Sequence, residues 1–257
     1  MSAFTFAFNN LITSTSCSTP SADSFFPFAN IFKTSTIKEY RAPLGTTSVI
    51  LTVDLLSATA VDSFFIAGNN ATRTLQTTTV TLKANTSNSF ASPAFTTTVT
   101  CNAAEAFGWL KFATQTYRYW QITVATSGSQ VGFANIFLGR SVQLPNNDVG
   151  PGWTFRREDR STFVEGRYGQ KYWDVLNTRK HISGQFDLLD ITERDAIVAM
   201  FDAVTTYRGI WVGYTAPNES ASAYNRVAGY FYADDTPEIN TSSYGLHSLP
   251  FSLTEVV

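Results

Sequence analysis

The chain has 257 residues, of which 44% are hydrophobic and only 15% are charged, which excludes an intrinsically disordered chain and provides ample apolar material for a core. This length suits one large domain or two of modest size. The formal net charge of −2 excludes a global field that would attract nucleic acid or a membrane surface, and the low charged fraction indicates that partners cover part of the surface.

The N-terminal residues MSAFTFAFNN lack the basic region and apolar run of a signal peptide. No stretch of about 18 apolar residues is available to span a membrane. We therefore expect synthesis in a cytoplasm and no membrane insertion. Two cysteines, Cys17 and Cys101, are too few for a disulfide framework in a chain of this length, so we expect free thiols.

Residues up to about 140 alternate short β-like runs with turn residues. The runs are rich in β-branched and aromatic residues, which suit a pleated sheet. Many short strands separated by turns predict a sandwich or a barrel. Along the run 117–124, alternation places Tyr117, Tyr119 and Gln121 on one face and Arg118, Trp120 and Ile122 on the other, and we expect one of these two faces to be core. In chain order the predicted strands are 47–55, 63–67, 77–83, 94–100, 117–124 and 132–139.

A cluster of turn residues divides the chain into two segments. Residues 141–152 hold two prolines, two glycines and three Asn or Asp residues, a typical punctuation of the chain. The composition also changes here, from rich in Ser and Thr to rich in charge. We predict one domain over 1–142, a linker over 143–152 and a second domain over 153–257.

The second segment is predicted to contain strands and one helix. Thr192 followed three residues later by Asp195 is a helix-start signal. The apolar residues that follow recur at helical spacing, which predicts a helix over about 192–207. Strands are expected over 209–214, 224–232 and 249–257, so the fold class is mainly β with one α-helix. The apolar helix positions are Ile197, Met200, Phe201 and Val204.

Charge is distributed unevenly along the second segment. Residues 156–180 carry seven basic and four acidic side chains, whereas residues 181–257 carry three basic and ten acidic ones. These two regions could meet head to tail in a ring of subunits. The alternative is two ordinary solvated faces, because exposed charges usually contribute little.

The sequence shows no local signature of catalysis. Its two histidines, His181 and His247, have no Cys, His or carboxylate at metal-ligand spacing, and the nucleophile-elbow and phosphate-loop motifs are absent. Glu158 and Asp159 lie among arginines, which favours an ion-pair cluster over a catalytic carboxylate pair. We expect no enzyme activity, metal or cofactor. A serine triad built from distant residues stays open, because triads are recognised by geometry.

The first segment resembles the galactose-binding-like jelly-roll family, which includes discoidin-type and carbohydrate-binding modules. The matching residues are Phe26-Pro27-x-x-Asn30, Ser48-x-Ile50 through Asp54-Leu55, Tyr117-Arg118-Tyr119-Trp120-x-Ile122 and Ile136-Phe137-Leu138-Gly139. The resemblance implies a jelly-roll sandwich over the first domain. The resemblance implies the architecture and not sugar binding, because the Arg-Tyr-x-x-Ile strand is mainly a signature of the fold.

The second segment resembles the β-sandwich-plus-helix domains of long-tailed phage tail proteins. The match is an order of elements: a strand, Phe186 to Asp190 leading into the helix, a strand opened by Gly209, a hairpin, and the closing strand 244–255. Distal tail proteins of this kind join such a β-sandwich or barrel to a galactose-binding-like domain, commonly in the reverse order.

These resemblances lead to a structural hypothesis and to an alternative. The leading hypothesis is a virion protein of the tail tip or baseplate that assembles with itself, as a ring or trimer, and with other tail proteins. The alternative is an adhesin module that binds a host surface glycan. Candidate subunit contacts are Trp153, Arg156, Arg157, Tyr168, Tyr172 and Trp173, and candidate glycan contacts are Trp109, Asn69 and Asn70.

Overall fold

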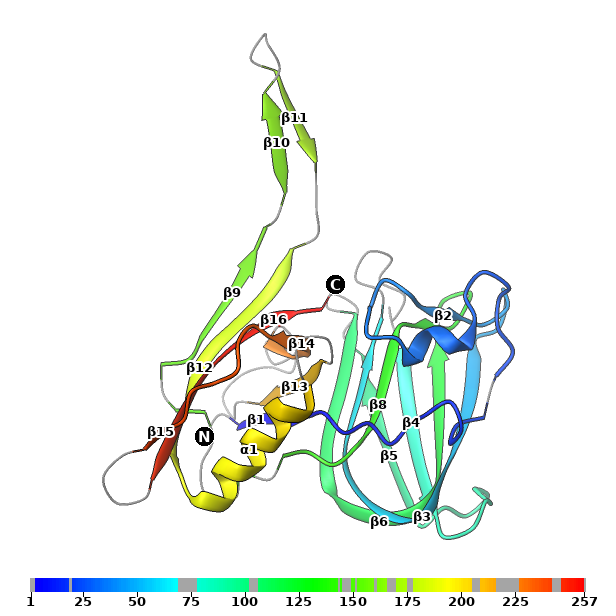
Figure 1. The fold of residues 1–257 in the computed structure, drawn as a ribbon. Helices are drawn as coiled ribbons and strands as arrows, with labels where there is room; N and C mark the ends of the chain where they lie inside the picture. Colours follow the sequence, from blue (N-terminus) through cyan, green and yellow to red (C-terminus); the bar gives the residue numbers. More distant parts are fainter. Residues whose placement is uncertain are drawn as a thin grey trace.

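The chain folds mainly into antiparallel β-strands that form two large sheets, as the computed structural model in Figure 1 shows. Within the described residues there is one α-helix, so the predicted mainly β class with one helix is confirmed. No helix in this part of the chain is long and apolar enough to cross a membrane. The structure describes residues 3–18, 20–68, 78–101, 106–142, 144, 149–150, 152–159, 161–165, 170–174, 178–204, 209–215, 227–241 and 246–256.

The first unit is built on a curved five-stranded sheet in the order β5-β4-β6-β3-β8. Two 20-residue strands, β3 (Ser48–Ala67) and β6 (Phe107–Thr126), pair antiparallel at its centre. The predicted strands 47–55 and 63–67 are one strand here, because bulges near 54–59 and 61–63 absorb the intervening residues without ending the pairing. The other strands are β4 (Thr78–Asn85), β5 (Phe95–Thr100) and β8 (Asn135–Gly139).

The inner face of this sheet holds the larger core. Trp120 and Ile122 are fully buried there, so the core face of this strand, which the sequence left open, is the one that carries these two residues. A 3-10 helix, η1 (Phe28–Phe32), and the short strands β2 (Tyr40–Arg41) and β7 (Gly132–Phe133) cover the core. Cys17 and Cys101 are buried in it as free thiols, as predicted.

The second unit is a seven-stranded sheet in the order β1-β13-β14-β16-β12-β9, with β15 (Asn240–Thr241) paired to β16. Its first strand, β1 (Ala3–Ala7), pairs with β13 (Ile210–Thr215). The predicted first domain therefore loses its first strand to the second unit, because Phe4 and Phe6 are buried in the second core. The remaining strands are β14 (Gly229–Ala233), β16 (His247–Glu255), β12 (Arg179–Leu189) and β9 (Thr154–Glu158).

The helix α1 (Ile191–Val204) begins with a different cap from the one predicted. The Asp190 carboxylate accepts the backbone N–H groups of Thr192 and Glu193, both at 2.8 Å, and the Glu193 carboxylate accepts the N–H of Asp190 at 3.2 Å. This is a capping box two residues earlier than the predicted start at Thr192. The predicted apolar face is confirmed, with Ile197, Met200, Phe201 and Val204 all buried.

The two units pack against each other through a third cluster of buried side chains. Phe64 and Ile66 point into the first core, while Phe65 between them points to the second unit. The same alternation places Phe137 of β8 against Trp211 of β13, with ring centroids 6.1 Å apart. This end of the first sheet is therefore buried on both faces, which explains its continuous apolar runs.

A long hairpin leaves the second unit and projects from the body of the molecule (Figure 1). Its base is the pairing of β9 with β12, and its outer part is the pair β10 (Thr162–Glu165) and β11 (Lys171–Asp174). Strand β9 ends the order of the seven-stranded sheet, so within the described residues its outer edge faces no further strand.

Candidate functional site

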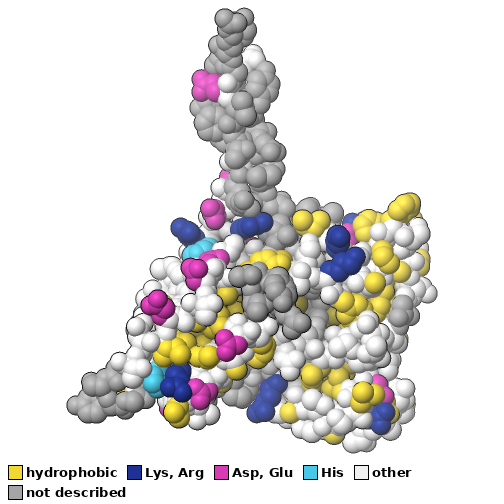
Figure 2. Space-filling model, viewed as in Figure 1, with side chains coloured by type: hydrophobic (Ala, Val, Ile, Leu, Met, Phe, Trp, Pro, Cys, Tyr) yellow, Lys and Arg dark blue, Asp and Glu magenta, His cyan; other side chains and the backbone are white. Residues whose placement is uncertain are grey.

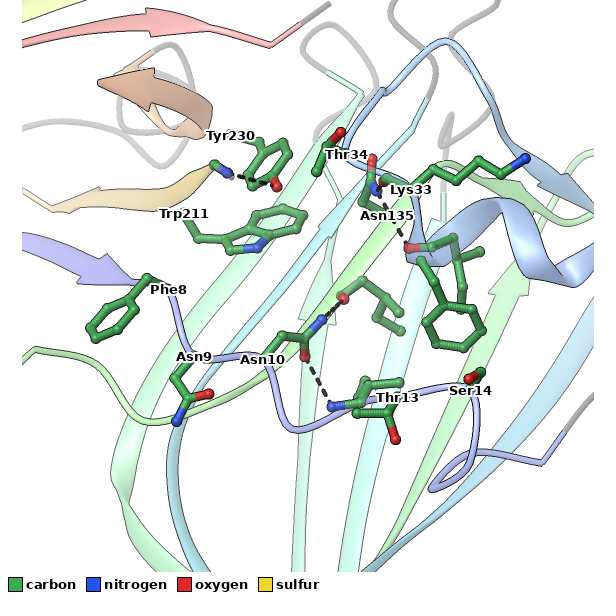
Figure 3. Close-up of a pocket in the computed structure, with 15 residues that line it drawn as sticks. Phe8, Asn9, Asn10, Thr13, Ser14, Lys33, Thr34, Asn135, Trp211 and Tyr230 are labelled. Carbon is green, nitrogen blue, oxygen red and sulfur yellow. Dashed lines mark hydrogen bonds between the residues drawn. The ribbon is translucent and has the colours of Figure 1, made fainter. Parts of the chain in front are cut away.

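A pocket of about 520 Å³ opens between the two units. Figure 3 shows Trp211 and Tyr230 on one side, Asn135 and Lys33 on the other, and the segment 9–14 running beneath them. The pocket exists because the chain crosses from β1 into the first unit at this point. The lining residues are Phe8, Asn9, Asn10, Ile12, Thr13, Ser14, Ile31, Phe32, Lys33, Thr34, Asn135, Ile136, Gly209, Trp211 and Tyr230.

Asn135, the first residue of β8, is the most unusual member of this lining. Only 5% of its surface is exposed. Its amide nitrogen donates to the carbonyl oxygens of Lys33, at 2.5 Å, and of Ile31, at 3.4 Å. These bonds fix the orientation of the amide, and its oxygen Oδ1 has no hydrogen-bond partner among the described residues. A buried acceptor without a partner costs about 1–3 kcal/mol, so a ligand that donates to Oδ1 would recover this energy.

Asn10 shapes the floor of the pocket. Its amide nitrogen donates to the carbonyl oxygen of Ile136 at 2.7 Å, and its amide oxygen accepts the N–H groups of Ile12 and Leu138, both at 3.1 Å. Both ends of this side chain are therefore engaged with backbone. Asn10 fastens the crossing segment to β8, whereas the amide oxygen of Asn135 has no hydrogen-bond partner among the described residues.

The second unit contributes an aromatic wall. The rings of Trp211 and Tyr230 lie 4.6 Å apart, centroid to centroid. The backbone N–H of Gly209 donates to the Tyr230 hydroxyl at 3.1 Å. A Cβ atom at residue 209 would lie 2.2 Å from the Tyr230 ring, so glycine is required for this close approach. Aromatic faces beside a few fixed polar groups are the usual composition of a small-molecule site.

The charge of the lining restricts the ligand. Lys33 is the one charged residue among the described lining residues, and no carboxylate accompanies it. Its side chain is exposed at the mouth of the pocket. An isolated positive charge disfavours cationic ligands and leaves neutral or anionic ones.

The predicted glycan contacts lie elsewhere or outside the described residues. Trp109 is on β6, stacked on Phe65 at 5.9 Å and packed against Gly213 of the second unit. Its ring faces belong to the packing between units, so its position gives no support to a glycan role. Asn69 and Asn70 lie outside the described residues. The sequence signal for Asn135 is a lone amide inside the apolar run 131–139, and it belongs to none of the motifs described above.

The predicted subunit contacts are divided in the same way. Trp153 packs against Phe4 and Tyr214, with ring centroids 5.1 Å from each, and so belongs to the second core. Arg156 and Arg157 are exposed on β9. Tyr168 lies outside the described residues, and Tyr172 and Trp173 are on β11 with side chains that are not described.

One cluster brings together the residue types of a serine triad. The His181 ring nitrogen Nε2 lies 3.0 Å from the Ser252 hydroxyl and 3.3 Å from the Asp234 carboxylate, and that hydroxyl donates to the same carboxylate at 2.5 Å. In a triad the acid and the nucleophile bind opposite ring nitrogens of histidine. Here both bind Nε2, so this cluster lacks the relay order. The described residues contain no group of three or more metal-ligating side chains.

Ion pairs hold the framework of the first unit. The Arg118 guanidinium binds both carboxylate oxygens of Asp54, at 2.7 and 2.8 Å, and so joins β6 to β3. These two residues carry the family resemblance noted in the sequence, and the structure gives them a role in the architecture. Arg41 pairs with the buried Glu39 and stacks over Phe26, 4.2 Å from the ring centroid.

No protein-family model and no curated protein matches this chain. Three solved structures show the kind of similarity that is found. A chitosan-binding module from a chitosanase/glucanase of Paenibacillus sp. IK-5 has a TM-score of 0.39 and 15% identity, over 51% of this chain and 99% of that one. A fucose-binding module of Streptococcus pneumoniae has a TM-score of 0.42 and 18% identity, over 52% and 96%.

The third is the lectin domain of lectinolysin in complex with Lewis B antigen, with a TM-score of 0.42 and 13% identity, over 52% of this chain and 97% of the other. All three are carbohydrate-binding modules that align with about half of this chain. At these identities and TM-scores, the similarities do not assign a ligand to this protein.

Proposed function

We propose that this protein binds a saccharide in the pocket between its two β units and acts as a binding protein rather than an enzyme. The observation that carries the proposal is the Oδ1 atom of Asn135, a buried acceptor without a partner in the wall of a ligand-sized pocket. The volume of about 520 Å³ falls within the roughly 300–1,000 Å³ typical of small-molecule sites.

The chemistry of the lining favours hydroxyl-rich ligands. Oδ1 of Asn135 requires a donor, which a sugar hydroxyl provides. Trp211 and Tyr230, which are 4% and 9% exposed and pack against each other, add an apolar wall, and Thr13, Ser14 and Thr34 add hydroxyl groups around the pocket. An ammonium ligand would also donate to Oδ1, but Lys33 at the mouth opposes a second positive charge.

Titration calorimetry with cellobiose, lactose, N,N′-diacetylchitobiose and fucosyllactose tests the proposal. We expect at least one to bind, and Asn135→Ala to weaken that binding on the order of ten- to a hundredfold. Thr34→Trp, which fills the mouth from an exposed position, should abolish it.

Asn85→Ala is the matched control, because the Asn85 amide also donates to two backbone carbonyls but lies outside the pocket. Its affinity should equal that of the unmodified chain. If no saccharide of a broad neutral and acidic panel binds, or if Asn135→Ala and Asn85→Ala behave alike, the pocket is not the site.

The projecting hairpin is the basis of a second proposal, that of a structural protein that assembles with copies of itself. Its β9 edge is open within the described residues, and Arg156 and Arg157 are exposed along it. Figure 2 shows acidic side chains spread over the second unit on the face in view. We propose that this edge and its basic side chains contact the acidic unit of a neighbouring copy, so that the copies close into a ring or trimer of the kind expected for a tail protein.

Light scattering at two protein concentrations tests this second function. We expect the mass of a closed ring or trimer, and a shift towards monomer when Arg156 and Arg157 are both replaced by Glu. Replacing Lys83 and Lys111 of the first unit by Glu is the matched control, and it should leave the mass unchanged. A monomer mass at both concentrations would remove self-assembly from the proposal.

A further inference from the structure

We infer that the ligand of this pocket clamps the two β units together, so that binding requires the docked units and in turn strengthens their docking. This inference rests on the proposed saccharide site and adds a regulatory property to it. It concerns the contact between the units, which the choice of sugar leaves open.

The first support is the origin of the lining. Lys33, Thr34 and Asn135 belong to the first unit, whereas Gly209, Trp211 and Tyr230 belong to the second. Figure 3 shows Trp211 and Tyr230 on one side of the pocket and Lys33 and Asn135 on the other. A ligand that donates to Asn135 and contacts the wall of Trp211 and Tyr230 therefore touches both units at once.

The second support is the position of Trp211. Its ring lines the pocket and also packs on the first unit, with centroids 5.6 Å from Phe65, 6.0 Å from Phe107 and 6.1 Å from Phe137. Trp211 therefore lines the pocket and also forms part of the contact between the units. A ligand that orders Trp211 also orders the interface.

The third support is how closely the units must approach. Trp109 of the first unit lies against the backbone of Gly213, where an added Cβ atom would be 2.4 Å from the indole ring. A hydrogen bond from the Thr36 hydroxyl to the carbonyl oxygen of Val256, at 3.2 Å, joins the units at another point. Neither Trp109 nor Gly213 lines the pocket, so the interface can be perturbed without altering the contacts to a ligand.

Coupling of this kind is reciprocal. If docking of the units raises the affinity for the saccharide by some factor, the saccharide raises the docking equilibrium by the same factor. Two measurements on the full chain, one of affinity and one of interface protection, therefore test the same quantity from opposite directions.

Hydrogen exchange with and without the tightest-binding saccharide of the calorimetric panel gives the first measurement. We expect slower amide exchange in η1 and β8 of the first unit and also in β13 and β14 of the second. Protection confined to the first unit would overturn the clamp and leave saccharide binding itself intact.

Interface variants give the second measurement. Trp109→Ala removes the contact and Gly213→Val forces it apart, and each should weaken saccharide binding at least tenfold. Leu82→Ala is the control, because it creates a cavity in the first core far from the interface and should leave affinity unchanged.

The two interface variants change volume in opposite directions, so misfolding of one leaves the other informative. Full affinity in a folded Trp109→Ala or Gly213→Val variant would overturn the clamp. Absence of binding by the unmodified chain would instead overturn the saccharide site.

Discussion

Replacing Lys180 by methionine tests a buried ion pair in the second sheet. Lys180 on β12 and Glu255 on β16 are 5% and 7% exposed. The lysine ammonium donates to the carbonyl oxygen of Ala228 at 2.9 Å and lies 3.6 Å from one Glu255 oxygen, while the Lys180 backbone N–H donates to the other at 3.1 Å. The substitution leaves the carboxylate buried without its countercharge.

The expected loss is large. Breaking a buried pair by removing one partner costs about 3–5 kcal/mol, a substantial share of the roughly 5–15 kcal/mol that stabilises a typical domain. The double variant Lys180→Met with Glu255→Gln should recover most of this loss, because a neutral amide still accepts the backbone N–H and needs no countercharge. The effects of the two substitutions are therefore not additive.

Urea unfolding, followed by tryptophan fluorescence and by circular dichroism, measures these free energies. Lys83→Met is the control, since Lys83 is only partly buried on β4, and it should change stability by no more than about 0.5 kcal/mol. A loss below about 1 kcal/mol for Lys180→Met, or a loss in the double variant equal to the sum of the two single losses, would show that Lys180 and Glu255 are not coupled as a buried ion pair.

Three further predictions follow from local contacts. Burial raises the pKa of the Cys17 and Cys101 thiols to about 12, so iodoacetamide at pH 8 should label both in urea but neither in the native chain; fast native labelling would contradict this burial. The hydrogen bond from Arg118 lowers the pKa of Asp54, so the folded chain binds fewer protons than the unfolded chain near pH 4. The carboxylate of Asp54 therefore stabilises the folded chain above about pH 4, and this stabilisation is lost as the pH falls through its lowered pKa. The urea midpoint should therefore fall less between pH 6 and pH 3 in Arg118→Leu than in the unmodified chain. An equal fall in both proteins would exclude the ion pair as the cause. Asp190→Ala removes the helix cap and should cost about 1 kcal/mol in urea unfolding, whereas Asp190→Ser should restore most of it; equal losses for the two variants would exclude a capping role.

The periodicity of apolar residues within one strand or one helix is enough to predict that element and the side chains that share a face. The helical spacing of Ile197 and Met200 holds in the structure. The two-faced alternation of strand 117–124 holds too, but only the structure shows that the face with Trp120 and Ile122 is core. These patterns are readable because each residue faces the core according to its place in its own strand or helix. The helix cap was misplaced by two residues, since Asp190 and Thr192 are both good caps and the backbone geometry selects between them.

Contacts between segments that are far apart in the sequence could not be predicted and are seen only in the folded structure. β1 joins the second sheet beside β13, across more than 200 residues of chain, and this crossing creates the pocket at Asn135. Lys180 is one of the seven basic residues of the range 156–180, but it is buried beside Glu255 instead of lying on the surface. Trp109 packs against Gly213 of the second unit, which is another contact between distant segments. Contacts of this kind depend on how the two sheets pack together, and packing between distant segments leaves no periodic signal in either of them.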